Sequence, residues 1–148
     1  MVAMQTATVS KTYKYRLQPT AEQAGTLAFV VRRCRELYNA GVQERRDAWQ
    51  MRGVSITAGS QSAQLPDIKE VRPEYHDVHS QVLQDVLTRL DRVFQAFFRR
   101  VKAGETPGYP RFHGANRYHS FTYEQFGNGA SLENGFPGLS KIGRIAVR

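Results

Sequence analysis

The 148-residue chain is predicted to be an α+β protein, with a helical middle between two ends that favour strands. Residues 12–18 alternate aromatic, basic and apolar side chains, as a strand does. Residues 27–42 and 82–101 carry apolar side chains three or four positions apart, which is the spacing of an amphipathic helix. After residue 105 this spacing disappears and Gly, Pro, Tyr and Phe dominate. We therefore expect helices over residues 20–104 and strands on either side.

The first predicted helix begins at Thr20, directly after Pro19 ends the strand. Thr20 stands three residues before Gln23, which is the spacing of a capping box. We expect the helix to reach Trp49 or Met51, before Gly53. Its apolar stripe consists of Leu27, Val30, Val31, Cys34, Leu37, Tyr38 and Val42. Its polar face is expected to carry Arg32, Arg33, Arg35, Arg45 and Arg46.

Residues 53–72 are rich in Gly, Ser, Gln and Pro and predict a loop that could hold one short helix. A second helix is expected over residues 78–102, ending at Gly104. Strands are expected at 118–123 and 143–148. The last of these ends the chain without a turn or polar tail, so we expect a truncated protein with an unpaired strand edge open to self-association.

The net charge of +8 is the first indication of function. The 21 basic residues, 16 Arg and only 5 Lys, outnumber the 13 acidic residues. Arginine presents a planar fork of donors that matches phosphate and stacks on bases, so this bias favours a polyanionic partner. A solvated basic surface without a partner is the alternative. No apolar run approaches the roughly 20 residues of a membrane helix, and no secretory signal is evident. We expect a protein of the cytoplasm.

The sequence offers no catalytic site. Cys34 lies in an apolar stripe, which favours a buried structural thiol over a nucleophile. His76 and His79 flank Asp77 and could begin a metal site, but no third ligand stands at a recognisable spacing, so a solvated helix start is favoured. The acidic residues lie among arginines on helix faces and predict surface ion pairs. No glycine-rich phosphate loop is present.

Residues 108–123 interleave aromatic and basic side chains. Such a pattern suits single-stranded or irregular RNA, in which rings stack on bases and arginines hold phosphates. Arg111, Arg117 and His119 are the predicted contacts. For Phe112 and Phe121 a place in a small hydrophobic core is favoured instead.

Several segments in order resemble the N-terminal part of the transposon-encoded OrfB/TnpB family. They are YKYRLQPTAEQ (13–23), RRCRELYN (32–39), VLQDVLTRLDRVFQAFFRRVKAG (82–104), PGYPRF (107–112), SFTY (120–123) and LSKIGRIAVR (139–148). The resemblance covers nearly the whole chain. It implies an RNA-guided DNA endonuclease related to compact type V CRISPR effectors, in which pairing with a guide supplies most of the specificity. Members are often labelled transposases with an N-terminal helix-turn-helix.

The resemblance also implies a domain plan. Residues 1–19 would be the first strand of a small β-barrel, the wedge domain, which is incomplete in this chain. Residues 20–104 would be a helical recognition lobe, and residues 105–148 the remaining wedge strands. The nuclease domain, with its Mg²⁺, and the zinc ribbon would lie beyond residue 148. This chain alone is therefore expected to bind no cofactor and to have no catalytic activity. The resemblance also implies association with a prokaryotic nucleoid.

The resemblance implies that Gln84 and Thr122 read a short motif beside the DNA target. Both match the residue type that the family has at these positions. Ser80, Gln81 and Tyr123 occupy neighbouring contact positions and differ in type. Glutamine can pair with adenine through two hydrogen bonds in the major groove. Contacts to the backbones of guide RNA and double-stranded DNA are expected from Arg16, Arg99 and Arg100. His113-Gly114 departs from relatives, which usually place Lys or Arg after the Phe.

A different interpretation is a stand-alone DNA-binding regulator or transposition accessory protein of the helix-turn-helix type. Such a motif needs a turn of three or four residues between its helices. The long segment 53–72 argues against it. A third interpretation is a decayed fragment without a specific partner.

Overall fold

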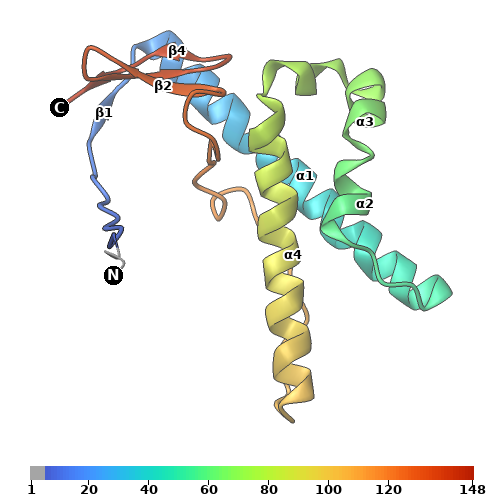
Figure 1. The fold of residues 1–148 in the computed structure, drawn as a ribbon. Coiled ribbons are helices and arrows are strands. Elements are labelled where there is room, and N and C mark those ends of the chain that lie inside the picture. Colours follow the sequence, from blue (N-terminus) through green and yellow to red (C-terminus); the bar gives the residue numbers. More distant parts are fainter. Residues whose placement is uncertain (1–5) are drawn as a thin grey trace.

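The computed structural model describes residues 6–148 and confirms the α+β class (Figure 1). Four α-helices and one 3-10 helix, η1, make up about half of residues 6–148, and the strands are short. The elements in chain order are β1 (Leu17–Gln18), α1 (Ala21–Arg52), α2 (Ala58–Ser62), α3 (Leu65–Val71), η1 (Pro73–Asp77), α4 (Ser80–Lys102), β2 (Ala130–Glu133), β3 (Phe136–Leu139), β4 (Gly143–Arg144) and β5 (Ala146–Val147).

Both predicted ends of the first helix are confirmed. The backbone N–H of Gln23 donates to Thr20 Oγ1 at 3.1 Å, and the Thr20 N–H donates to Gln23 Oε1 at 3.0 Å, which completes the capping box. Gly53 ends the helix with φ +63°, and its N–H donates to the Trp49 carbonyl at 2.9 Å. Only glycine adopts this left-handed backbone conformation without strain. The cap residues therefore set the length of α1.

The core lies where α1 crosses α4 (Figure 1). Gly41 sits at this crossing: a Cβ there would lie 2.5 Å from Leu90 Cδ2, so the missing side chain lets the two helices approach closely. Beyond the crossing their C-terminal ends diverge (Figure 1). The largest fully buried side chains of the two helices are Val30, Cys34, Val42, Val82, Leu83, Val86 and Leu90. Both predicted apolar stripes therefore form one shared core.

The prediction that Arg45 lies on the polar face is wrong. The residue is 5% exposed, and its Nε donates to Gln61 Oε1 at 3.0 Å. Its Nη2 pairs with Asp91 Oδ1 at 2.9 Å, and its guanidinium lies 5.0 Å from the centre of the Phe94 ring. Burial is possible because Nε and Nη2 both meet acceptors and the guanidinium lies over a ring. Arg45 thus links α1, α2 and α4.

Residues 53–77 hold more helix than expected. The prediction of a loop with one short helix over residues 53–72 is wrong, because two helices, α2 and α3, lie there and η1 follows them. Leu65 and Tyr75 are buried and anchor this segment to the core. The Tyr75 hydroxyl donates to Glu36 Oε2 at 3.2 Å. Two anchors separated by ten residues are too sparse to give a periodic signal.

The strands form two small antiparallel sheets. In one, β1 pairs with β5, with Leu17 opposite Val147; in the other, the order is β2-β3-β4. The Ile145 N–H donates to the Pro137 carbonyl at 2.9 Å and joins the two sheets. The strands of residues 6–148 do not close into a barrel. Arg148 also donates its N–H to the Arg16 carbonyl at 2.9 Å.

Three predictions about strands need correction. The strand at 12–18 is reduced to Leu17–Gln18. Residues 118–123 form no strand; Tyr118, Phe121 and Tyr123 pack against the helical core instead. The final segment is not unpaired, because β5 meets β1 and β4 meets β3. Across residues 6–148, no helix has the length and apolar character needed to cross a bilayer.

Candidate nucleic-acid interface

The start of α4 carries the residues expected to read DNA. His79 precedes the helix, and its Nδ1 accepts a hydrogen bond from the Gln81 backbone N–H at 3.2 Å. Ser80 Oγ accepts from Lys69 Nζ at 2.7 Å, so α3 contributes a cation beside the first turn. Gln84 lies one turn further along and is exposed. The side chain of Gln84 makes no hydrogen bond within residues 6–148 and is free to meet a ligand.

The segment 120–125 lies beside these first turns. Gln81 Nε2 donates to Gln125 Oε1 at 3.0 Å. The Tyr123 hydroxyl donates to the Ser140 carbonyl at 2.7 Å, and its ring packs 5.5 Å from the His79 ring. This segment has no backbone ladder, so side-chain contacts of this kind hold it in place. They bring the predicted residues Ser80, Gln81, Gln84, Thr122 and Tyr123 together on one surface, which we call the α4-start surface.

Arg89 is the main clasp between α4 and this segment. Its Nη1 donates to the carbonyl and the Oγ of Ser120 at 2.9 and 3.1 Å, and its Nη2 donates to Thr122 Oγ1 at 2.7 Å. Its Nε lies 2.8 Å from Asp85 Oδ2. The arginine stands four residues after Asp85, and this spacing predicts the ion pair, though at the surface rather than with a buried carboxylate. The hydrogen bonds to Ser120 and Thr122 have no signal in the sequence.

The electrostatics beneath the surface are mixed. Asp85 is buried, with a side chain 8% exposed, and Glu124 lies near it. A hydrogen bond with Asp85, partial burial and the Asp85 charge all raise the pKa of Glu124 above its ordinary value, while Arg92 lowers it. Burial raises the pKa of the Tyr123 hydroxyl to about 12, so this group is a neutral donor at pH 7. Arg89 therefore compensates an acidic pair in addition to its positioning role.

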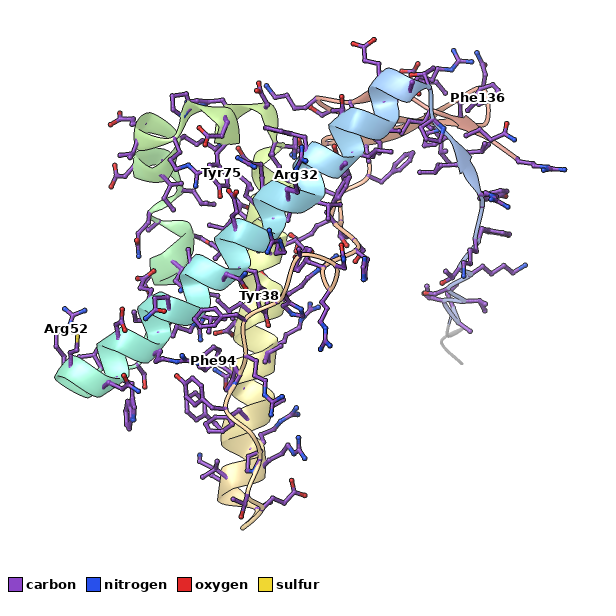
Figure 2. The ribbon with its side chains drawn as sticks, turned by 180° about the vertical axis from the view of Figure 1, so that it is seen from behind. Arg32, Tyr38, Arg52, Tyr75, Phe94 and Phe136 are labelled. Atoms are coloured by element: carbon purple, nitrogen blue, oxygen red, sulfur yellow. The ribbon has the colours of Figure 1, made fainter. Side chains whose placement is uncertain are left out.

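Other predicted contacts lie away from the α4-start surface. Arg99 and Arg100 are exposed near the end of α4, about 22 Å from Gln84 along the helix axis at 1.5 Å per residue. Arg111, Arg117 and His119 are exposed on the segment between α4 and β2. Arg16 is exposed beside β1. The predicted basic contacts thus lie on α4, beside β1 and on the segment between α4 and β2. Figure 2 shows nitrogen-tipped side chains along both long helices and around the sheets.

The interleaved aromatic segment divides into anchors and exposed groups. Tyr118 is buried, and His113 packs between it and Tyr38, with ring centres 5.6 and 4.6 Å away. Asn39 fixes this segment to α1: its Nδ2 donates to the His113 carbonyl at 2.9 Å, and its Oδ1 accepts from the His113 N–H at 2.8 Å. His113, the departure from the family pattern, is thus a packing residue.

Phe112 and Phe121 were both expected to lie in a small hydrophobic core, and only Phe121 does. Phe121 is partly buried against the helical core, as predicted. Phe112 is 44% exposed, and Arg46 lies 4.9 Å from its ring centre, so the prediction of a core position is wrong for Phe112. Among residues 6–148, no group of three or more His, Cys, Asp or Glu side chains is arranged to hold a metal ion. His79 serves as the N-cap of α4.

Residues 4–53 match the family model of the OrfB/IS605 helix-turn-helix domain. The match covers about a third of the chain, and this N-terminal region is similar to the OrfB/IS605 family. The resemblance predicted from the motifs is confirmed over this segment, and the match supports a DNA-binding domain of the helix-turn-helix class. No curated protein matches the chain.

The matched OrfB/IS605 segment does not fold as two helices joined by a turn. Its described part, residues 6–53, holds β1 and the single continuous helix α1. The turn of three or four residues that defines a helix-turn-helix is therefore not found between residues 6 and 53. A binding surface has to be sought where α1 meets the rest of the chain.

Proposed function

We propose that the chain is the nucleic-acid-binding part of a TnpB-like, RNA-guided DNA endonuclease, and that it has a binding rather than a catalytic role. In this proposal the α4-start surface reads a short motif in double-stranded DNA. The exposed arginines elsewhere hold the backbone of a guide RNA. The small sheets would belong to a wedge-type barrel. The OrfB/IS605 match over residues 4–53 supports the family to which this activity belongs.

The observation that carries the proposal is the convergence of residues on the α4-start surface. Gln84 is exposed on a helix, with its amide unengaged, and Arg89 of the same helix holds Thr122 by a hydrogen bond of 2.7 Å. A helix of this kind fits the major groove, and a glutamine amide can accept from and donate to adenine at once. Phosphate contacts would fix the register of the helix, and the base contact would specify sequence.

The stand-alone regulator is less well supported. A regulator of that type would need a second helix that is free to enter the major groove. Here the helix that follows α1 is α2, which is five residues long and carries the buried Gln61. In the described chain α4 is a long helix whose first turns carry exposed polar side chains, among them Gln84.

The proposal is tested by selecting bound duplexes from a randomised DNA library with the 148-residue chain. The wild type is expected to enrich a short motif. Gln84→Ala should relax one position of that motif by roughly five- to a hundredfold, the discrimination of one two-bond base contact. Gln95→Ala is the matched control, because Gln95 is also exposed on α4, eleven residues away. Enrichment of the same motif by Gln84→Ala would refute the assignment of this residue.

A further inference from the structure

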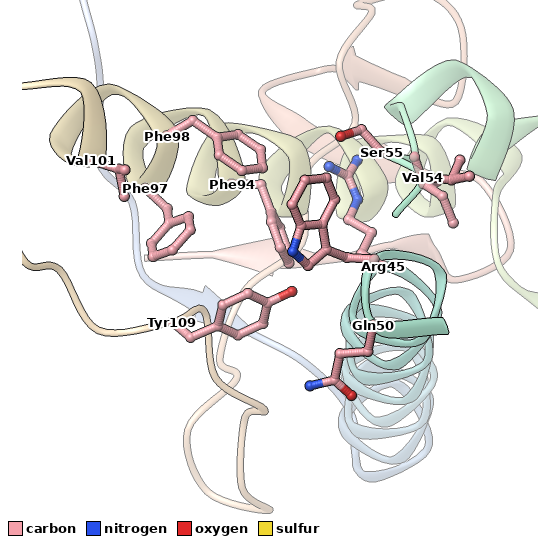
Figure 3. Close-up of a pocket in the computed structure, with 11 residues that line it drawn as sticks. Arg45, Gln50, Val54, Ser55, Phe94, Phe97, Phe98, Val101 and Tyr109 are labelled. Carbon is pink, nitrogen blue, oxygen red and sulfur yellow. The ribbon is translucent and has the colours of Figure 1, made fainter. Parts of the chain in front are cut away.

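An apolar hollow of about 640 Å³ lies between the diverging ends of α1 and α4 (Figure 3). Phe94, Phe97, Phe98 and Val101 of α4 line it, and so does Tyr109, whose ring packs edge-on against Phe94 and Phe97 at centre distances of 5.7 and 5.4 Å. Trp49 of α1 also lines it. These side chains are only partly used for packing: Trp49 is 59% exposed, Phe98 42% and Val101 49%. The α4-start surface lies at the opposite end of α4.

A second hollow of about 260 Å³ adjoins the first. Trp49, Gln50 and Tyr109 line both, and Arg46 borders only the second. The Arg46 guanidinium lies 5.4 Å from the Tyr109 ring centre. Within residues 6–148, Arg46 makes no ion pair with an acidic side chain. The apolar space therefore continues to the guanidinium of Arg46, which lies over the Tyr109 and Phe112 rings and has no acidic partner among the described residues.

The charge around both hollows selects among possible occupants. Basic residues outnumber acidic ones at these two helix ends; the bases are Arg46, Arg52, Arg99, Arg100 and Lys102, and the acids are Asp47 and Glu105. A second copy of the chain would bring the same cations against one another, which is unfavourable. A nucleic-acid strand supplies both complementary features, flat rings for the hollow and phosphates for the cations.

We propose that this aromatic groove receives an unpaired base from a loop or bulge of a bound RNA, with Arg46 holding a neighbouring phosphate. The bases of intact duplex DNA are stacked on one another, whereas RNA loops present splayed bases to aromatic side chains. The polar groups at the edge, the Tyr109 hydroxyl and the Gln50 amide, can meet the hydrogen-bonding edge of that base. This inference rests on the proposed function and adds an RNA site separate from the DNA-reading surface.

Trp49 is the only tryptophan of the chain, so its fluorescence reports on the groove directly. The 148-residue chain is titrated with a ten-nucleotide oligouridylate and with an abasic RNA strand of equal length, and binding is measured separately by fluorescence anisotropy of end-labelled strands. Both strands are expected to bind through phosphates, but only the oligouridylate should quench Trp49. Phe98→Ala should weaken oligouridylate binding at least about fivefold. Phe126→Ala, a truncation at a side chain 75% exposed and outside both hollows, should change nothing.

Each other outcome overturns the inference. Equal quenching by both strands would mean that phosphates alone are bound, and the proposed function would survive without this site. A ten-nucleotide oligothymidylate is titrated in the same way, and tighter binding of this DNA strand than of oligouridylate would remove the assignment to RNA. Self-association that Phe98→Ala abolishes would identify a second copy as the occupant. Absence of binding by either strand would refute the proposed function itself. The comparison of strands uses the wild-type chain, so it remains decisive even if Phe98→Ala fails to fold.

Discussion

Replacing Arg89 by methionine tests whether side chains, rather than a backbone ladder, hold residues 120–123 on α4. Methionine keeps an apolar stem on the helix and removes the guanidinium. The change deletes the hydrogen bonds to Ser120 and Thr122 and leaves the buried Asp85 carboxylate without its nearest cation.

The expected loss follows from these contacts. A hydrogen bond to a charged group contributes about 1.5–3 kcal/mol, and leaving a buried charge without its partner costs about 3–5 kcal/mol. The Arg89 side chain is 27% exposed, so solvent screens part of both effects and the contributions do not add in full. We therefore expect the free energy of unfolding to fall by about 3 kcal/mol.

The measurement is urea unfolding followed by Trp49 fluorescence, combined with the rate of tryptic cleavage after Arg117. Arg92→Met is the control, since Arg92 is exposed on the same helix, and no ion pair joins it to an acidic residue in the described chain. The control should lie within about 0.5 kcal/mol of the wild type, as for ordinary surface substitutions. If Arg89→Met loses no more stability than Arg92→Met, or leaves tryptic cleavage unchanged, the clasp does not exist as described.

Three further predictions concern burial and backbone. Asp91→Ala should lower the free energy of unfolding by about 2–4 kcal/mol, and Glu105→Ala by less than about 1 kcal/mol. Both acids lie 2.9 Å from an arginine, but only the arginine that pairs with Asp91 is buried. Equal losses of stability in urea unfolding would contradict this. Burial raises the pKa of Cys34 to about 12, so the folded chain keeps a proton that the unfolded chain releases above about pH 9. Stability should therefore fall between pH 9 and 12, and iodoacetamide should label Cys34 only on unfolding; labelling of the native chain at pH 8 would refute the burial. Gly53→Ala at φ +63° should destabilise by about 1 kcal/mol and Gly25→Ala, inside the same helix, should stabilise by up to about 1, as judged by thermal unfolding; the same sign for both would be inconsistent with the left-handed cap.

The helices were predictable because their signals are local. Thr20 and Gln23 form a reciprocal cap within four residues, and Gly53 supplies a conformation that other residues resist. The apolar stripe of α4 repeats over most of its length, so neither its existence nor its buried face depends on distant contacts. The fold class and both long helices follow from such patterns.

The β part was harder, and one signal was missed. Asn134 and Gly135 both have positive φ and join β2 to β3 in a two-residue hairpin, with Glu133 opposite Phe136. An Asn-Gly pair is the strongest short-range hairpin signal, and it was available in the sequence. The alternation at 118–123 predicted a strand that does not form, because its aromatic residues pack on helices that are distant in sequence.

The candidate site was predictable only in part. The resemblance located Gln84 and Thr122, and the structure brings the segments that hold them together. The burial of Arg45 and the clasp of Arg89 depend on Gln61, Asp91 and Ser120, partners that no helical periodicity relates to them. Contacts between segments more than fifteen residues apart set these roles.

The salt dependence of RNA binding tests the central claim, that this chain grips nucleic-acid phosphates through its arginines. The affinity of the 148-residue chain for a structured RNA hairpin is measured between 50 and 200 mM KCl. With about four to six phosphates neutralised, log Kd should rise with log salt with a slope of roughly 3–5. Arg99→Ala combined with Arg100→Ala should lower this slope by about one to two. A slope near zero, or no binding at low salt, would contradict the account.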